Sequence, residues 1–224
     1  AKCEYFDVSD MKKVLEEAKR VNTKEHQING EIGTRVYGTN ADVICFLIYT
    51  GLRVGECLAL KYSDIEEDDL SGETFIRINS TLKRLPNEEG KLVLQRGSTK
   101  TQSSKRKVAL CKEALEIIDA QKKANPKATK DDYIFVGETG MPIHYRNVNR
   151  TLKCMLERAN CKNQSISVHS LRHTFASYLV SKDVNIFTVS KLLGHSSIRT
   201  TETVYAEMLE KSNIDAVNLF SNIG

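Results

Sequence analysis

The chain of 224 residues contains no tryptophan, only three prolines and no long hydrophobic run. Without an apolar stretch of about 20 residues, we expect no membrane-spanning helix. The first residues lack the layout of a signal peptide. The six cysteines contain no CxxC pair, which argues against a zinc site. We therefore expect buried free thiols in a reducing environment, and a cytoplasmic protein with no membrane contact.

Positive charge is distributed unevenly, although the net charge is only +4. Residues 64–69 are mostly acidic, whereas residues 96–107 contain five Lys or Arg residues and no acidic residue. Residues 144–158 form a second basic block with one glutamate. Such blocks favour a polyanionic partner such as DNA, although a solvated basic surface is the common alternative. The candidate DNA contacts are Arg96, Lys105, Arg106, Lys107, Arg146 and Arg150.

Hydrophobic periodicity predicts a mainly helical chain. A polar stretch over 22–40 is predicted to be a loop, and the apolar helix after it should end at Gly51, because glycine is common where a helix stops. The next helix begins near Val54, which puts Arg53 at a tight corner between two helices. Helices are predicted over 11–20 (capped by Ser9 or Asp10), 40–49, 54–60, 113–123, 144–159, 170–180 (capped by Ser170), 186–193, 198–207 and 209–219.

Between residues 74 and 110 the hydrophobic period changes to two. Alternation over 74–81, 91–95 and 105–110 predicts three short strands, separated by turn-rich stretches. Three strands with one apolar face are about the minimum for a stable sheet, and a helix must cover that face. The predicted fold class is therefore α+β and mainly α, with one small three-stranded antiparallel sheet.

Three short motifs and a later tyrosine carry chemical information. They are TGLRVGE at 50–56, HSLRHT at 169–174, LLGHSS at 192–197, and Tyr205. Together, in this order, they resemble the catalytic motifs of the tyrosine recombinase (phage integrase) family. The likeness covers nearly the whole chain. The stretch TKTQSSKR at 99–106 is similar to the integrases of conjugative transposons.

The two arginines of these motifs suit a phosphodiester under attack. Such a group gains negative charge on its nonbridging oxygens, and a guanidinium stays charged and offers paired donors to them. Arg53 and Arg172 are the predicted phosphate ligands. Glu56, three residues after Arg53, is predicted to orient a cationic side chain, with a helix-capping role as the alternative.

Tyr205 is the candidate nucleophile. A phenol has a pKa near 10, so it needs nearby cations or a base to lose its proton at neutral pH. Tyr205 follows His195 by ten residues, where many family members have nine. His169 is predicted to exchange a proton with the phenol, and His195 to donate a hydrogen bond to a phosphate oxygen. A metal pair of His169 with His173 is disfavoured because the glutamate of an HExxH motif is absent.

The resemblance implies a lysine that protonates the leaving 5′-oxygen. Lys100 fits best, with Lys105 and Lys107 as rivals. The resemblance further implies attack that leaves a 3′-phosphotyrosine, rejoining to a partner strand without ATP or another cofactor, and no metal. Residues 1–224 would form the catalytic domain, without the arm-binding and core-binding domains of such integrases.

The implied partners are double-stranded DNA at recombination sites, three further copies in a tetramer, and an accessory DNA-bending or directionality factor. The apolar segment 214–220 would dock on a neighbouring subunit or pack on its own core. Two other functions stay open at this point. One is a type IB topoisomerase, which shares the covalent chemistry. The other is a non-catalytic module in which residues 184–201 form a helix-turn-helix.

Overall fold

The structure is a computed structural model that describes residues 6–22, 26–28, 31–33, 36–86, 88, 90, 92–98, 105–137, 139–195, 197 and 201. Lys100, Tyr205, most of the predicted helix 198–207 and the whole of the helix 209–219 lie outside the described residues. In the described part, helices dominate and the strands are short and antiparallel. The expected α+β, mainly α class is confirmed.

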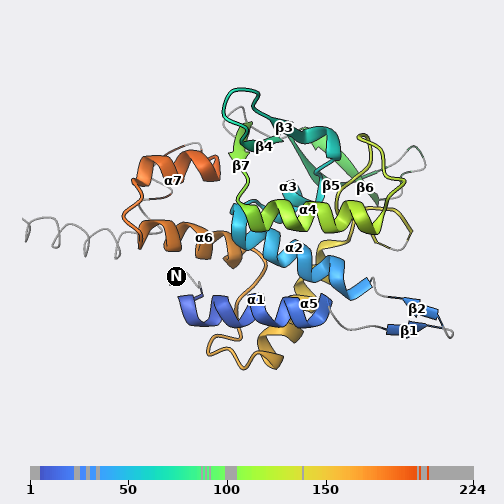
Figure 1. Ribbon diagram of the computed structural model, residues 1–224, viewed down its shortest axis with the longest axis horizontal. Coiled ribbons are helices and arrows are strands. Elements are labelled where there is room, and N and C mark those ends of the chain that lie inside the picture. Colours follow the sequence, from blue (N-terminus) through green and yellow to red (C-terminus); the bar gives the residue numbers. More distant parts are fainter. Residues whose placement is uncertain are drawn as a thin grey trace, which may run out of the picture.

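The helices surround one buried helix, α2 (Figure 1). It contacts α1, α4, α5 and α6, and its side chains from Ala41 to Leu47 are all buried. A helix that is apolar on every side belongs in a core, and the sequence of α2 has this character. The helices are α1 (Val8–Asn22), α2 (Val36–Thr50), α3 (Val54–Leu58), α4 (Lys112–Ala124), α5 (Tyr145–Arg158), α6 (Ser170–Val180) and α7 (Ile186–Leu193).

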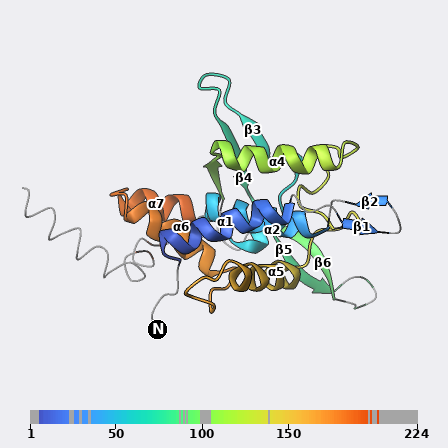
Figure 2. The same cartoon turned by 60° about the horizontal axis from the view of Figure 1, so that its bottom comes forward.

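Helices α6 and α7 lie at one end of the molecule, opposite the β1–β2 hairpin (Figure 1, Figure 2). They enclose a small apolar cluster of their own, which includes Ala176, Val180, Val189 and Leu193. The main core lies between α1, α2, α4, α5 and the three-stranded sheet. No described helix combines the length and the apolar character that a bilayer crossing requires.

The three-stranded sheet has the order β3–β4–β7, and β1–β2 and β5–β6 form two separate hairpins. In the sheet, Ile76 pairs with Ile65 on one side and with Val108 on the other. Ile76, Ile78 and Val108 are buried in the main core. The strands are β1 (His26–Ile28), β2 (Glu31–Gly33), β3 (Ile65–Glu67), β4 (Thr74–Ile78), β5 (Ser80–Pro86), β6 (Leu92–Ser98) and β7 (Arg106–Ala109), with a 3-10 turn at Tyr62–Asp64.

The predicted membership of this sheet was wrong in one strand. Residues 92–95 of that predicted strand lie in β6, which pairs with β5 in a separate hairpin, and the third strand of the sheet is β3. The acidic sequence of β3 did not indicate a strand. Glu66 faces outward there and forms ion pairs with Arg77 and Lys107 across the sheet. The predicted strand 74–81 is divided at Asn79, where the chain leaves β4 and enters β5.

Three local predictions also need correction. The predicted loop 22–40 contains the β1–β2 hairpin and the first turns of α2. Neither Ser9 nor Asp10 caps α1, because Asp7 accepts the amide proton of Asp10 at 2.7 Å. Ser170 does not cap α6 with its side chain; the Ser167 carbonyl and hydroxyl accept the Ser170 amide proton. In both helices the cap lies upstream of the predicted residue.

Candidate active site

Arg53 lies at the predicted corner between two helices. Helix α2 ends at Thr50, Gly51 adopts a left-handed φ of +63°, and Arg53 is the extended residue before α3. A Cβ atom on Gly51 would lie 2.3 Å from the Phe175 ring, so the corner packs directly on α6. Only glycine satisfies both the positive φ and this close approach. The Arg53 side chain remains 40% exposed and faces outward from this rigid turn.

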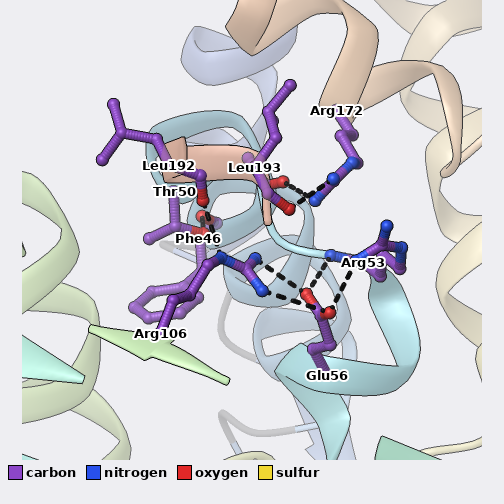
Figure 3. A network of polar contacts seen from close by, with 9 residues as sticks. Phe46, Thr50, Arg53, Glu56, Arg106, Arg172, Leu192 and Leu193 are labelled. Atoms are coloured by element: carbon purple, nitrogen blue, oxygen red, sulfur yellow. Dashed lines mark hydrogen bonds and ion pairs between the residues drawn. The ribbon is translucent and has the colours of Figure 1, made fainter. Parts of the chain in front are cut away.

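Glu56 connects Arg53 to a second arginine (Figure 3). Its carboxylate accepts the backbone N–H of Arg53 at 3.0 Å and the Arg53 Nη1 at 2.9 Å. The same carboxylate accepts Arg106 Nη2 at 3.0 Å. Burial of Glu56, which is 3% exposed, would raise its pKa, but the hydrogen bond and charge of Arg106 and then the contacts with Arg53 lower it below the ordinary value. Glu56 therefore both caps α3 and orients two cations.

Arg106 is a structural link between three parts of the site. It extends from β7, donates from Nε to the Leu192 carbonyl at 2.7 Å, and pairs with Glu56. Its side chain is only 7% exposed, and a Cβ atom on Gly194 would lie 2.9 Å from Arg106 Nη1. The structure thus holds Arg106 in the interior, next to the catalytic motifs. The sequence could have indicated this burial. Arg106 and the buried, apolar Val108 are two residues apart in β7, so their side chains lie on the same face of the strand.

Arg172 occupies the centre of the site, in the first turn of α6. It is 3% exposed, and its Nη1 donates to the Gly51 carbonyl at 3.0 Å. Its Nη2 donates to the Leu193 carbonyl at the end of α7. A single guanidinium therefore joins the α2–α3 corner to the end of α7 (Figure 3). This arrangement fixes the guanidinium plane before any ligand binds.

The histidines of the motifs lie beside these arginines. Partial burial lowers the pKa of His169, and the charges of Arg172 and Arg53 lower it further. The pKa of His195 falls to about 4, again through burial first and then through Arg172 and Arg53. The same two guanidinium groups act on both rings, so the structure brings Arg53, Arg172, His169 and His195 together. Both imidazoles are mainly neutral at pH 7.

Thr201 is a site residue that the motifs did not predict. Its hydroxyl is fully buried and lies 2.7 Å from Nδ1 of His195. When the hydroxyl donates to Nδ1, the ring proton must be on Nε2. Thr201 also lies four residues before Tyr205 in the sequence. The small polar side chain six residues beyond a motif histidine gave no signal of its own, because only the fold brings it to the ring.

The remaining predicted residues fall into three groups. Arg96 pairs with the buried Asp64 at 2.7 Å and thereby fastens the β5–β6 hairpin, and Lys107 pairs with Glu66 on the outer face of the sheet. Lys105, Arg146 and Arg150 are exposed. Lys100 and Tyr205 lie outside the described residues. The proposed DNA contacts of this set stay predictions.

His169, which directly precedes α6, and His173 in α6 pack edge to face, with their ring centroids 5.2 Å apart. Among the residues that the structure covers, no three His, Cys, Asp or Glu side chains gather as they would around a metal ion. The charged groups of the site are instead the guanidinium groups of Arg53, Arg106 and Arg172 with the carboxylate of Glu56. This excess of positive charge suits an anionic ligand with several oxygen acceptors.

Glu56→Gln should lower the free energy of unfolding by about 2–3 kcal/mol at pH 7, because it weakens charge-assisted hydrogen bonds of a buried arginine. Since its pKa is lowered in the folded protein, ionised Glu56 contributes stability above the ordinary glutamate pKa of 4.5. That contribution is lost as the pH falls through the folded pKa. The free energies of unfolding of the wild type and of Glu56→Gln should therefore converge in acid. Urea denaturation at several pH values measures this.

Glu116→Gln is the matched control for that experiment. Glu116 is an exposed glutamate that forms a 3.8 Å pair with Lys112 on α4. Its substitution should cost no more than about 0.5 kcal/mol, as for other exposed helix pairs. Equal decreases in the free energy of unfolding of the two variants would contradict the role of Glu56 as a buried link between two arginines.

Known proteins resemble this chain over most of its length. The phage integrase family matches residues 16–212. An integrase of Staphylococcus phage L54a is 31% identical over 169 residues, which are 72% of this chain and 46% of that protein. A tyrosine recombinase XerC-like protein of Caldanaerobacter subterraneus subsp. tengcongensis is 30% identical over 187 residues, covering 78% of this chain and 47% of that protein. The chain thus spans about half the length of these relatives.

Solved structures share the fold. The Tn1549 transposon integrase, in complex with transposon right end DNA, superimposes with a TM-score of 0.71 at 20% identity, covering 92% of this chain and 62% of that one. The catalytic domain of bacteriophage HP1 integrase gives a TM-score of 0.53 at 17% identity and covers 98% of both chains. The matched range includes every catalytic motif described above. The chain therefore belongs to the phage integrase family of tyrosine recombinases.

Proposed function

We propose that this chain is the catalytic domain of a site-specific DNA recombinase that integrates or excises a mobile element. The observation that carries this proposal is the preorganised pair Arg53 and Arg172, with His169 and His195 beside them. Buried hydrogen bonds fix the Arg172 plane, so a phosphodiester meets donors that need little rearrangement. Relatives named integrase or tyrosine recombinase, and neighbours solved with DNA, support the same substrate.

The first step of the proposed reaction is attack by the Tyr205 hydroxyl oxygen on the scissile phosphorus. A P–O bond to tyrosine forms, and the bond to the 5′-oxygen of the next nucleotide breaks. His169 accepts the phenolic proton, for which its lowered pKa leaves it mainly unprotonated at pH 7. Lys100 donates a proton to the leaving 5′-oxygen. Arg53 and Arg172 hold the nonbridging oxygens, where negative charge increases.

The second step is the reverse reaction with another strand. A 5′-hydroxyl of the partner duplex attacks the phosphotyrosine, a new phosphodiester forms, and Tyr205 recovers its proton. One phosphodiester is replaced by another, so the proposed cycle requires neither ATP nor another cofactor. His195 would donate from Nε2 to a phosphate oxygen throughout, in the tautomer in which the Thr201 hydroxyl donates to Nδ1.

Thr201→Val should slow formation of the covalent adduct by about 3- to 10-fold, because a net hydrogen bond contributes about 0.5–1.5 kcal/mol. Valine keeps the shape of threonine, whereas Thr201→Ser keeps the hydroxyl and should retain most of the rate. The 15N chemical shifts of the His195 ring should report loss of the fixed tautomer in the valine variant only. If Thr201→Val forms the adduct slowly but the 15N chemical shifts of the His195 ring are unchanged, Thr201 contributes through packing alone.

The proposed assembly follows from the chemistry. Exchange between two duplexes needs four cleaved strands, so we infer a tetramer on DNA, with segment 214–220 docking on a neighbouring subunit. The basic residues Lys105, Arg146 and Arg150 would contact the DNA backbone, since their side chains are exposed. A DNA-bending or directionality factor would act with this assembly, and the cell compartment would be the cytoplasm.

Covalent capture tests the proposed function and identifies the DNA site in the same experiment. The chain is incubated with a random duplex library that carries a nick just 3′ of the randomised scissile position, so that the 5′-hydroxyl product diffuses away. DNA that remains attached after denaturation is amplified and selected again. Mass spectrometry of the linked peptide should place the DNA on Tyr205.

The result that would contradict the proposal is the absence of any linked DNA, or a link to a different residue. A plasmid assay separates the recombinase from a topoisomerase. Relaxation of supercoiled plasmids that lack the selected sequence would favour the topoisomerase, whereas exchange between two plasmids that carry it would support recombination.

A further inference from the structure

A cavity of about 400 Å³ opens next to the corner between α2 and α3. It lies between α3, the β5–β6 hairpin and the start of α5. Its lining includes Val54 and Gly55, the two residues that directly follow Arg53 in the sequence. Its volume falls within the range of about 300–1,000 Å³ that is usual for small-ligand pockets. A ligand in this cavity would therefore be a near neighbour of a phosphate bound at Arg53.

The cavity is apolar inside and positively charged at its edge. Leu58 and Ile143, which are buried, line it together with Leu82 and Leu94 of the hairpin. The edge is formed by Arg84 of β5 and by residues 144–146 at the start of α5. An apolar interior with a cationic edge fits a ligand that has a flat apolar part and an attached anion.

The cations at this edge lie close together. The pKa of His144 is lowered by its burial and then by the charges of Arg84 and Arg146, which places both guanidinium groups near one ring. Neither arginine forms an ion pair with a described residue, in contrast to Arg96 of the same hairpin. The start of α5 adds the positive end of a helix dipole. Such a concentration of positive charge suits an anion.

Tyr145 adds a stacking surface to the cavity. It is 51% exposed, although most large apolar side chains of the described chain are buried. Exposed aromatic rings in basic surfaces commonly stack with unpaired nucleobases. A nucleotide combines a flat base, whose two faces stack on apolar and aromatic groups, with a phosphate, so its two parts suit the cavity and the cationic edge.

We propose that this cavity receives one unstacked nucleotide of the DNA next to the scissile phosphate. The base enters between Leu58, Leu82 and Leu94, and its phosphate lies between Arg84 and Arg146. This inference rests on the proposed recombinase function and adds to it a base-recognition site outside the duplex. The enzyme must then unpair one base. The free-energy cost of unpairing is smallest where the base is already mismatched.

A mismatch scan tests the proposal on the duplex obtained by covalent capture. Single mismatches are placed in turn at each position within one helical turn of the cleavage point, and the Kd is measured by fluorescence anisotropy. At one position the mismatched duplex should bind about 5- to 10-fold more tightly, because the cost of unpairing is already met. Leu94→Phe, which fills the cavity, should remove this gain. For each protein, the gain is the ratio of the Kd for the fully matched duplex to the Kd for the mismatched duplex.

A matched pair of arginine variants on α5 provides an independent reading. Arg146→Gln at the cavity edge should reduce the mismatch gain, whereas Arg158→Gln at the far end of the same helix should leave it unchanged. A mismatch also makes DNA easier to bend, but a gain from bending would persist in Leu94→Phe. If Leu94→Phe does not fold, the two arginine variants decide.

The outcomes distinguish the two levels of inference. No position-specific gain, or a gain that persists in Leu94→Phe or in Arg146→Gln, would overturn the nucleotide cavity while adduct formation on Tyr205 still supported the recombinase. Failure to capture any DNA would instead remove the proposed function itself.

Discussion

Arg172→Gln should reduce the rate of covalent adduct formation by about 100- to 1,000-fold, the loss typical of removing one preorganised donor from a transition state. Arg172 is buried and held by the carbonyls of Gly51 and Leu193, so its position is set before DNA binds. Glutamine is too short to make both contacts and carries no charge. Single-turnover cleavage of the captured nicked duplex gives the rate.

Arg172→Lys separates charge from geometry in the same experiment. Lysine keeps the charge but cannot offer the planar pair of donors, so its rate should fall between glutamine and the wild type. Arg77→Gln is the control, because Arg77 pairs with Glu66 on the outer face of the sheet. Thermal unfolding followed by circular dichroism shows whether each variant is folded. A folded Arg172→Gln protein that cleaves at nearly the wild-type rate would remove Arg172 from the chemistry.

Tyr205→Phe should abolish the covalent adduct entirely while leaving DNA affinity within about 2-fold of the wild type, since only the attacking oxygen is lost. Phenylalanine keeps the ring, and the phosphate ligands Arg53 and Arg172 are unchanged. Denaturing gel electrophoresis with labelled duplex detects the adduct, and anisotropy under native conditions gives the Kd. Retained adduct in this variant would mean that another residue is the nucleophile.

The sequence predicted most helix positions because their signals are local. The helix predicted before residue 51 ends there, and the helix predicted over 186–193 ends before Gly194; both glycines adopt a positive φ, of +63° and +66°. The short spacing between Gly51 and the next helix put Arg53 at a corner, as the structure has it. Such features depend on backbone geometry within a few residues, so no distant contact is required to specify them.

Sheet membership was predicted less well because pairing partners are distant in the sequence. Residues 65–67 look like a solvated acidic turn, but they form an edge strand once Arg77 and Lys107 lie across from Glu66. The segment 91–95 has strand character, and nothing local shows which strand it will pair with. The same limit applies to Arg106, whose place in a basic run suggested the surface while its strand face directs it to the interior.

The sequence by itself determined the fold class, the helix ends at Gly51 and Gly194 and the identity of the motif residues, because each follows from residue type and short spacing. Tertiary structure alone decided that Glu56 joins Arg53 to Arg106, that the buried hydroxyl of Thr201 reaches His195, and that α3, the β5–β6 hairpin and α5 enclose a cavity. These features arise where segments far apart in the chain pack together. Their distances depend on the whole core, and no local pattern encodes them.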